Sequence, residues 1–297
     1  MIEDVSGKTA AGEAVVAADI GADSLPEKTI IEAKSGWRFI DWRELWNYRD
    51  LFFFLVWRDI KTRYAQSVLG VGWALIQPVF SMIIFTIIFG NFVQVSSDGV
   101  PYAIFNYAAL VPWTFFAGSL TGATGSLVGS ANMITKVYFP RLIIPLAPVL
   151  GKLVDFAIAM LLLLVMMLYF GIGPTMGVLF LPVLVLMMML AAAGLGMWLT
   201  ALAVQYRDIN YGLGFFVQIL MYAAPVVYST NVVPERLRLF YALNPMVGVI
   251  EGFRSALLAT NPMPWDLIGV GAAVGLFLFI SGALYFRHME RIFADVV

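Results

Sequence analysis

Six long apolar runs, separated by shorter polar connections, dominate the residue pattern from residue 69 onward. The runs are Leu69–Val93, Tyr102–Val128, Leu142–Phe170, Val178–Val204, Leu213–Tyr228 and Leu267–Phe286. An α-helix needs about 20 apolar residues to cross a hydrocarbon core of about 30 Å, and all the runs except the short fifth one reach that length. Backbone polar groups in lipid must be hydrogen-bonded within the protein. The pattern therefore predicts an all-α integral membrane protein with six transmembrane helices.

Basic residues are unevenly distributed between the two sides of a membrane drawn through these runs. Fifteen of the eighteen Lys and Arg residues precede the first run or lie in the second and fourth connections, at the start of the third run and in the tail. The first and third connections hold none, and the fifth holds Arg236, Arg238 and Arg254. Lys and Arg collect on the cytoplasmic side of membrane proteins. We therefore expect a multi-pass protein with both termini in the cytoplasm.

The composition narrows the function classes. Hydrophobic residues make up 61% of the chain and charged residues 12%, far from the values of a soluble domain. There is no cysteine, so disulfides and thiolate metal sites are excluded, and the single histidine, His288, fits a structural role better than a catalytic one. The sequence contains no phosphate-binding loop of the form G-x-x-x-x-G-K-[ST]. We expect no catalytic residue, metal, cofactor or nucleic acid on this chain.

The chain before the first run divides into two regions. Residues 1–36 are polar and acidic and lack the features of a signal peptide, so we expect a disordered cytoplasmic arm. Residues 37–66 interleave aromatic and charged side chains, as in an amphipathic helix that lies in the headgroup plane. The residues of this interface helix that we single out are Trp42, Trp46, Arg58, Asp59, Lys61 and Arg63. The helix is either a membrane anchor alone or also contacts a cytoplasmic partner, and its charge density favours the second.

The second connection is short and cytoplasmic, yet partly apolar. Its informative residues are Asn132, Met133, Lys136, Val137, Tyr138, Phe139, Pro140 and Arg141. An exposed apolar patch usually marks a contact surface, and Pro140 ends any helix there. A helix of one to two turns at this place would fit a groove on another protein. The alternative, packing against the ends of neighbouring helices, is equally compatible with the residues.

The long fifth connection predicts two short helices, at about 234–243 and 246–259, separated by Asn244 and Pro245. Glu251 and Arg254 stand three residues apart and are placed to form an ion pair, and Phe253 lies between them. Neither helix is long enough to cross. They fit re-entrant helices that dip in from the outer side and act as a gate, because irregular backbone at that depth must be buried or line a wet cavity. The alternative is a surface cap without a gating role.

Two aromatic and amide stripes are candidates for a permeation path. The stripes consist of Tyr211, Phe215, Gln218 and Tyr222 in the fifth run, and of Trp73, Gln77 and Phe80 in the first. Each set falls at helical spacing. Aromatic faces stack on sugar rings, and amides and phenols bind hydroxyls. Helix packing explains the stripes equally well.

Lys152 and Asp155 are a charged pair three residues apart inside the third run. Charges at membrane depth are costly and usually face the protein interior. The pair either neutralises itself as a structural contact, which we favour, or meets a phosphate-bearing headgroup.

Four stretches in this order resemble the permease subunits of bacterial ABC exporters for polysaccharides and polyol phosphates, with O-antigen exporter permeases the most similar group. The stretches are Arg58–Tyr64 with Trp73 and Pro78, Lys136–Arg141 with Pro145, Tyr206–Ile209 with Pro225–Tyr228, and Asn244–Met246 with Phe253–Arg254. Residues 67–297 would then be the ABC-2 type transmembrane domain. The acidic arm is longer than the resemblance leads us to expect.

The resemblance implies a homodimeric permease of the bacterial inner membrane that associates with two copies of an ABC ATPase subunit, on which ATP and Mg are bound. It implies that Asn132–Phe139 is the coupling helix seated in the ATPase, that Trp42–Arg63 is the interface helix within the region 37–66, and that the fifth connection holds gate helices. The expected substrate is a lipid-linked, O-antigen-like polysaccharide. Teichoic-acid and capsular-polysaccharide exporters are the alternatives within the family.

An intramembrane glycan-processing enzyme is the alternative from a different class. Such an enzyme needs convergent carboxylates or a metal site. Asp98 and Glu235 lie in outer connections with no companion acid or histidine nearby in the sequence, which argues against an enzyme. A secondary transporter would show inverted halves, and the chain shows no such repeat.

Overall fold

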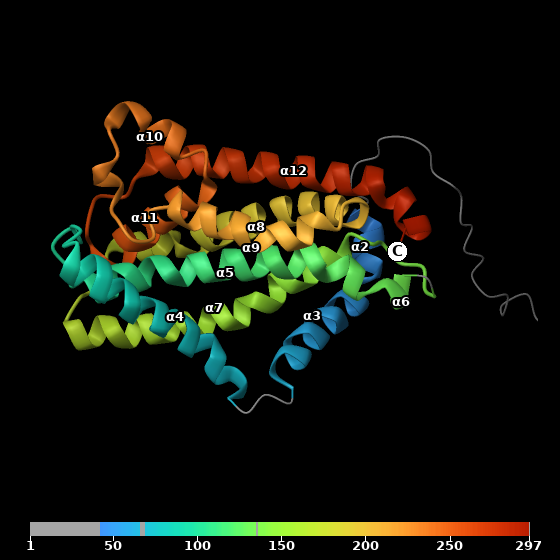
Figure 1. The fold of residues 1–297 in the computed structure, drawn as a ribbon, viewed down its shortest axis with the longest axis horizontal. Coiled ribbons are helices and arrows are strands. Elements are labelled where there is room, and N and C mark those ends of the chain that lie inside the picture. Colours follow the sequence, from blue (N-terminus) through green and yellow to red (C-terminus); the bar gives the residue numbers. More distant parts are fainter. Residues whose placement is uncertain (1–41, 66–68, 135, 297) are drawn as a thin grey trace, which may run out of the picture. The chain divides into compact units, whose positions relative to one another are not determined.

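The computed structural model describes residues 42–65, 69–134 and 136–296, and every regular element in these ranges is a helix (Figure 1). The all-α class is confirmed. The acidic arm at residues 1–36 and the first residues of the interface region, 37–41, lie outside the described residues.

The helices follow the apolar runs and the shorter segments between them. In chain order they are α2 (Trp42–Asn47), α3 (Arg49–Tyr64), η1 (Gly70–Gly72), α4 (Trp73–Phe85), the π-helix η2 (Thr86–Phe92), α5 (Tyr102–Gly129), α6 (Ala131–Ile134), α7 (Ile143–Phe170), η3 (Met176–Phe180), α8 (Leu181–Gln205), α9 (Asp208–Tyr222), η4 (Thr230–Val232), α10 (Glu235–Tyr241), α11 (Pro245–Leu258) and α12 (Trp265–Val296). In Figure 1, α2 and α6 lie at the end of the long helices where the chain terminates, and α10 and α11 lie at the other end.

Five segments of the described chain are long and apolar enough to cross a membrane. They are Gly70–Phe92, Tyr102–Gly129, Ile143–Phe170, Met176–Gln205 and Trp265–Glu290, and they match five of the six predicted runs. The remaining run, Leu213–Tyr228, corresponds to α9, which has 15 residues and ends before Pro225. At 1.5 Å per residue such a helix covers only about 22 Å. The fold therefore supports five crossings by length, and the sixth is not shown.

Two buried helices form the centre of the packing. α5 lies against α7 and α8, and α11 lies against α5, α8 and α12. Every residue of α11 is buried, although its sequence has one apolar face and carries Glu251 and Arg254. The burial on all sides shows that α11 is a core helix and not a surface cap.

Small residues allow α8 and α12 to pack closely. A Cβ atom at Gly282 of α12 would lie 2.3 Å from the carbonyl oxygen of Gly194 in α8, and one at Gly194 would lie 2.4 Å from the amide nitrogen of Phe279. Only glycine fits such a backbone approach, which is how membrane helices gain packing energy without a hydrophobic driving force. This contact keeps α12 beside α8 along the bundle.

The helices predicted outside the apolar runs are present, with shorter bounds. α10 and α11 confirm the two helices of the fifth connection, and Asn244 caps α11 by accepting a hydrogen bond from the backbone nitrogen of Met246 at 3.1 Å. The helix in the second connection is a single turn, α6, and residues 137–140 are not helical. The interface segment is divided at Tyr48 into α2 and α3.

Candidate functional site

The predicted coupling segment combines an anchored part with an exposed part. Phe139 is buried, with 3% of its surface exposed, in a cluster with Leu127, Ile134 and Phe286, whereas Val137 and Tyr138 are exposed at 56% and 62%. Lys136 and Asn132 are exposed as well, and Met133 and Pro140 are half-buried. Phe139 is therefore a residue of the bundle core, and the part of this segment that faces outward is formed by its neighbours.

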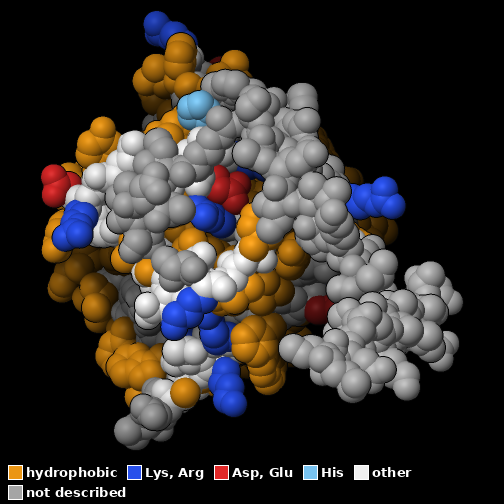
Figure 2. Space-filling view, turned by 90° about the vertical axis from the view of Figure 1, so that its right-hand side faces the viewer, with side chains coloured by type: hydrophobic (Ala, Val, Ile, Leu, Met, Phe, Trp, Pro, Cys, Tyr) orange, Lys and Arg blue, Asp and Glu red, His pale blue; other side chains and the backbone are white. Residues whose placement is uncertain are grey.

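Arg141 ties the end of this segment to α12. Its backbone nitrogen donates to Oε1 of Glu290 at 3.2 Å, and its Nη1 donates to the Glu290 carbonyl at 2.7 Å. Because Ile134 before them and Phe139 after them are buried, and Arg141 is hydrogen-bonded to α12, Val137 and Tyr138 are held facing outward. Figure 2 views this end of the helices and shows Lys and Arg side chains among hydrophobic ones, with few acidic side chains between them. Such a surface suits a protein partner that carries acidic groups.

Asp155 of α7 is the centre of a charged joint between α3 and α7. Its Oδ2 accepts from Nη1 of Arg63 at 3.0 Å and from Nζ of Lys152 at 2.8 Å. Its Oδ1 accepts from the Tyr64 hydroxyl. Arg63 is also paired with Asp59 one turn earlier in α3. The Lys152–Asp155 pair is thus confirmed and is part of a larger cluster that fastens the C-terminal end of α3 to α7.

Tyr64 stays neutral in this joint. Burial and, after it, the hydrogen bond and charge of Asp155 together raise the pKa of the Tyr64 hydroxyl to about 12, against the opposing charge of Arg63. The hydroxyl is therefore a hydrogen-bond donor at any physiological pH.

A small cavity lies between α3, α5 and α7 beside this joint. Its volume is about 200 Å³, and Arg58 and Asp59 of α3 line one side, with Ser126 and Ser130 on the other. Arg58 donates from Nη2 to the Ser130 hydroxyl oxygen at 3.4 Å, a long hydrogen bond. Of the other residues singled out in the interface helix, Trp46 and Lys61 are exposed, and the side chain of Trp42 lies outside the described residues.

Both candidate permeation stripes are exposed on helices that lack a full set of neighbours. Every residue of the two stripes is exposed: Tyr211, Phe215, Gln218 and Tyr222 on α9, and Trp73, Gln77 and Phe80 on α4. Phe216 and Ile219 of α9 and Ile83 and Ile84 of α4 are exposed as well. Phe215 is 71% exposed, and 6% of the most apolar stretch of Gly70–Phe92 is buried. The structure places each stripe on one helix and leaves both free to meet lipid or another protein.

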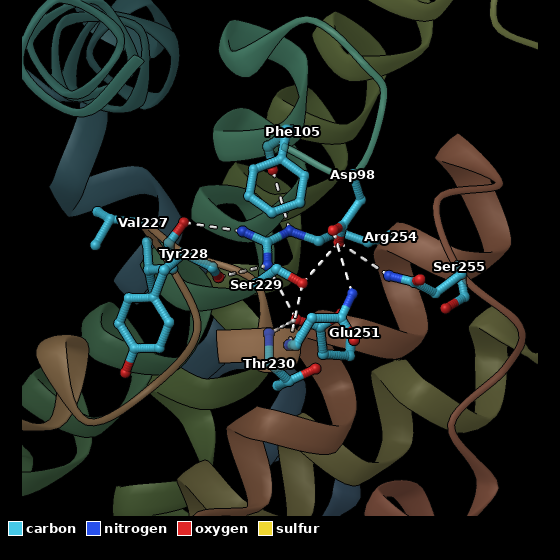
Figure 3. A network of polar contacts seen from close by, with 12 residues as sticks. Asp98, Phe105, Val227, Tyr228, Ser229, Thr230, Glu251, Arg254 and Ser255 are labelled. Atoms are coloured by element: carbon cyan, nitrogen blue, oxygen red, sulfur yellow. Dashed lines mark hydrogen bonds and ion pairs between the residues drawn. The ribbon is translucent and has the colours of Figure 1, made fainter. Parts of the chain in front are cut away.

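Two of the predicted gate residues, Glu251 and Arg254, form a buried ion pair (Figure 3). Arg254 has no exposed surface, and its Nη1 pairs with Oε1 of Glu251 at 3.1 Å, as predicted. It donates to the carbonyl of Phe105 at 3.2 Å, to that of Tyr228 at 3.1 Å and to that of Val226 at 3.0 Å. Its Cζ lies 3.6 Å from the centre of the Phe105 ring, a cation–π contact. The ion pair is confirmed, and it joins α11 to α5 and to the chain after α9.

Asp98 joins the first connection to two parts of the fifth connection, and the sequence reasoning missed these contacts. Its carboxylate accepts from the Ser229 hydroxyl at 2.6 Å, from Nδ2 of Asn231 at 3.2 Å and from Nδ2 of Asn261 at 2.9 Å. Figure 3 shows Asp98 beside the Arg254 and Glu251 pair. The sequence offered only a weak signal, because the partners lie more than 130 residues away along the chain.

Nothing in the described ranges forms a metal site, since no three His, Asp or Glu side chains there lie close enough together to hold an ion. The arrangement is that of a helical membrane protein in which the predicted coupling segment is anchored at Phe139 and Arg141 and two aromatic stripes are exposed. Polar contacts of Arg254 and Asp98 connect α11 and the first connection to the chain after α9.

Residues 50–258 match the ABC-2 type transporter family, which is more than half of the chain. The chain therefore belongs to this family and is a membrane component of a transporter, not an enzyme. The O-antigen export system permease protein RfbA of Myxococcus xanthus is 28% identical over 257 residues, which cover 86% of this chain and 98% of the relative.

Two further relatives are similar along much of the chain. An RfbA permease of Klebsiella pneumoniae is 25% identical over 84% of this chain and 95% of its own length. The polysialic acid transport protein KpsM of Escherichia coli is 21% identical over 68% of this chain and 78% of its own length. The resemblance seen in the four sequence stretches is confirmed at the level of the family.

Proposed function

We propose that this chain is the permease subunit of an ATP-driven exporter that moves a lipid-linked, O-antigen-like polysaccharide from the cytoplasm across the inner membrane. The observation that carries the proposal is the match, over 84–86% of the chain, with permeases named for O-antigen export. ATP and Mg are bound by a separate ABC ATPase, present in two copies. A capsular polysaccharide is the second candidate substrate, favoured by the similarity to KpsM.

The exposed part of the coupling segment supports an ATPase contact. Val137 and Tyr138 protrude between the buried residues Ile134 and Phe139, and Arg141 follows as a further anchor, so a force on them is transmitted to α5, α7 and α12. The ion pair between Arg63 and Asp155 connects α3, the proposed interface helix, to α7, which the coupling segment also contacts. Closure of the ATPase pair would thus move both segments together.

The chemistry of the exposed helix faces supports a conduit between two copies of the chain. The exposed residues of α7 include Leu161, Leu164 and Leu168, which are purely aliphatic and suit lipid. The faces of α4 and α9 carry Gln77 and Gln218 among aromatic rings. An amide is costly against lipid and is favoured at helix contacts or in a wet path. In our proposal α4 and α9 from each of two copies line the polysaccharide conduit. Because the dimer is symmetric, each lining residue occurs twice along the conduit wall.

The proposed topology has six crossings and both termini in the cytoplasm. α9 completes its crossing through residues 223–229, which extend it toward α10. Those residues are irregular, and they are held by side chains of α5 and α11 instead of by lipid-exposed hydrogen bonds. α10 and α11 then lie on the outer side as the re-entrant gate.

The coupling role is tested by replacing Tyr138 with Ala. Tyr138 is exposed, so the bundle should insert and fold as before, while co-purification of the ATPase and glycan export should both fall by about tenfold, as for loss of an exposed aromatic anchor. Tyr169→Ala, which replaces an even more exposed tyrosine at the far end of α7, is the matched control and should change neither quantity. Normal ATPase recovery and export in Tyr138→Ala would refute the contact. Phe139 is unsuitable for this test because it belongs to the core.

A further inference from the structure

The chain immediately after α9 is held from the inside by side chains of two other helices. Residues 226–228 present three consecutive carbonyl oxygens to the core, where they accept hydrogen bonds from Tyr102 and Asn106 of α5 and from Arg254 of α11. The distances lie between 2.6 and 3.1 Å. The backbone at Tyr228 is therefore fixed, because a shift would leave several buried polar groups unpaired at once.

The side chain of Tyr228 connects this fixed point to two other elements. Its hydroxyl donates to the carbonyl oxygen of Tyr222, the last residue of α9, at 2.9 Å. The same hydroxyl oxygen lies 2.7 Å from the hydroxyl of Tyr241, the last residue of α10. A phenol has one proton. Because Tyr228 donates its proton to Tyr222, Tyr241 must be the donor in the tyrosine pair.

α10 is otherwise loosely attached. Most of its residues are exposed, including the apolar Leu237, Leu239 and Phe240, and its buried anchor is Ala242 directly after its end. The hydrogen bond between Tyr241 and Tyr228 thus connects α10, which is weakly packed, to the fixed backbone at Tyr228. Burial raises the pKa of the Tyr241 hydroxyl above its usual value, and the hydrogen bond with Tyr228 adds to this, so Tyr241 remains a donor at physiological pH.

We propose that Tyr228 and Tyr241 are positioning residues that latch α10 to the outer end of α9. When the pair is formed, Tyr241 donates to Tyr228 and Tyr228 donates to the carbonyl of Tyr222. These two hydrogen bonds hold the last turn of α9, which carries Tyr222 of the α9 stripe, in place. Release of the pair frees α10 while Arg254 keeps the backbone of Tyr228 where it is, so α10 is the moving part of the exit. The role in export rests on the proposed function, whereas the latch itself is a property of the fold.

Hydrogen exchange of the full permease with its ATPase in lipid nanodiscs tests the latch directly. Tyr241→Phe removes the donor and keeps the ring, and the exchange of the amides of α10 should rise about fivefold, the effect of losing one hydrogen bond of ordinary strength. Tyr228→Phe should do the same and also increase exchange at the end of α9. Exchange in α11 should stay unchanged in both variants. Tyr169→Phe, an exposed tyrosine on α7, is the control.

The amount of glycan exported per ATP hydrolysed separates positioning from simple stability. Tyr241→Phe should lower this ratio at least twofold with normal recovery of the ATPase, because the exit no longer closes in step with hydrolysis. Unchanged exchange in α10 for both variants would overturn the latch, and increased exchange with an unchanged ratio would overturn its positioning role. Failure of the unmodified complex to export glycan would instead refute the proposed function, and the exchange data would still decide whether the latch exists.

Discussion

At the scale of the residue, the most consequential group is the guanidinium of Arg254. A buried charge is tolerated when it is paired and its donors are satisfied, and here one carboxylate, three carbonyls and one aromatic face surround it. The Glu251–Arg254 spacing of three residues made the ion pair predictable. The three carbonyls were not predictable, since they come from residues 105, 226 and 228, which only the tertiary fold brings to α11.

Replacing Arg254 with Leu should destabilise the protein strongly. The change leaves Glu251 as a buried charge without its cationic partner and removes one donor from each of three carbonyls, of which that of Val226 keeps Asn106 as a donor. Together these losses should cost about 3–5 kcal/mol. The thermal unfolding temperature of the purified protein measures this. Arg254→Leu combined with Glu251→Leu should recover part of the loss, because the orphaned charge is gone. If the double variant is less stable than the single one by as much again, the pair is not the source of the effect.

At the scale of the element, the sequence predicted the existence of the helices better than it predicted where they end and which of their side chains are buried. The apolar runs gave α4, α5, α7, α8 and α12 with small shifts of their ends, because about 20 apolar residues leave little choice in lipid. Hydrophobicity did not reveal that Phe139 points into the core while Tyr138 points out, because both are aromatic and adjacent. Nor did it show that α9 stops at Tyr222, since the apolar run continues through Pro225.

The joint between α3 and α7 gives a prediction about pH. The pKa of Tyr64 is raised from 10.0 to about 12, so its neutral form is the one favoured by folding. The stability that the Tyr64 hydroxyl contributes is therefore fully present below pH 10 and is lost as the pH rises toward 12. Unfolding temperatures of the natural protein and of Tyr64→Phe should differ by a constant amount from pH 6 to 9. That difference should shrink above pH 10, and a gap that widens there would contradict the assignment.

At the scale of the whole molecule, the distribution of charged residues and the exposure of the helices are both consistent with the proposed dimeric permease. The predicted cytoplasmic connections lie at the end of the helices that carries α6. The first and third connections, which hold no basic residue, lie at the end that carries α10 and α11, together with the fifth connection and its three arginines. Burial divides the long helices into central ones, above all α5, and exposed ones, above all α4 and α9. Apolar character alone would give the wrong order, because the most buried span, that of α5, has the lowest mean hydropathy of the five candidate spans.

The lack of cysteine makes the proposed dimer directly testable. A chain with Phe80→Cys in α4 and Phe215→Cys in α9 should be linked into dimers by a short bifunctional maleimide in native membranes, because amide-bearing faces are more stable against each other than against lipid. Leu161→Cys and Leu168→Cys in α7, also exposed but on an aliphatic face, form the control and should stay monomeric under the same treatment. Equal linking of both pairs would mean random collision, and linking of the α7 pair alone would place the partner on the aliphatic face. Selective linking through α4 and α9 would put both aromatic stripes at one seam, where a conduit for a polymer requires them.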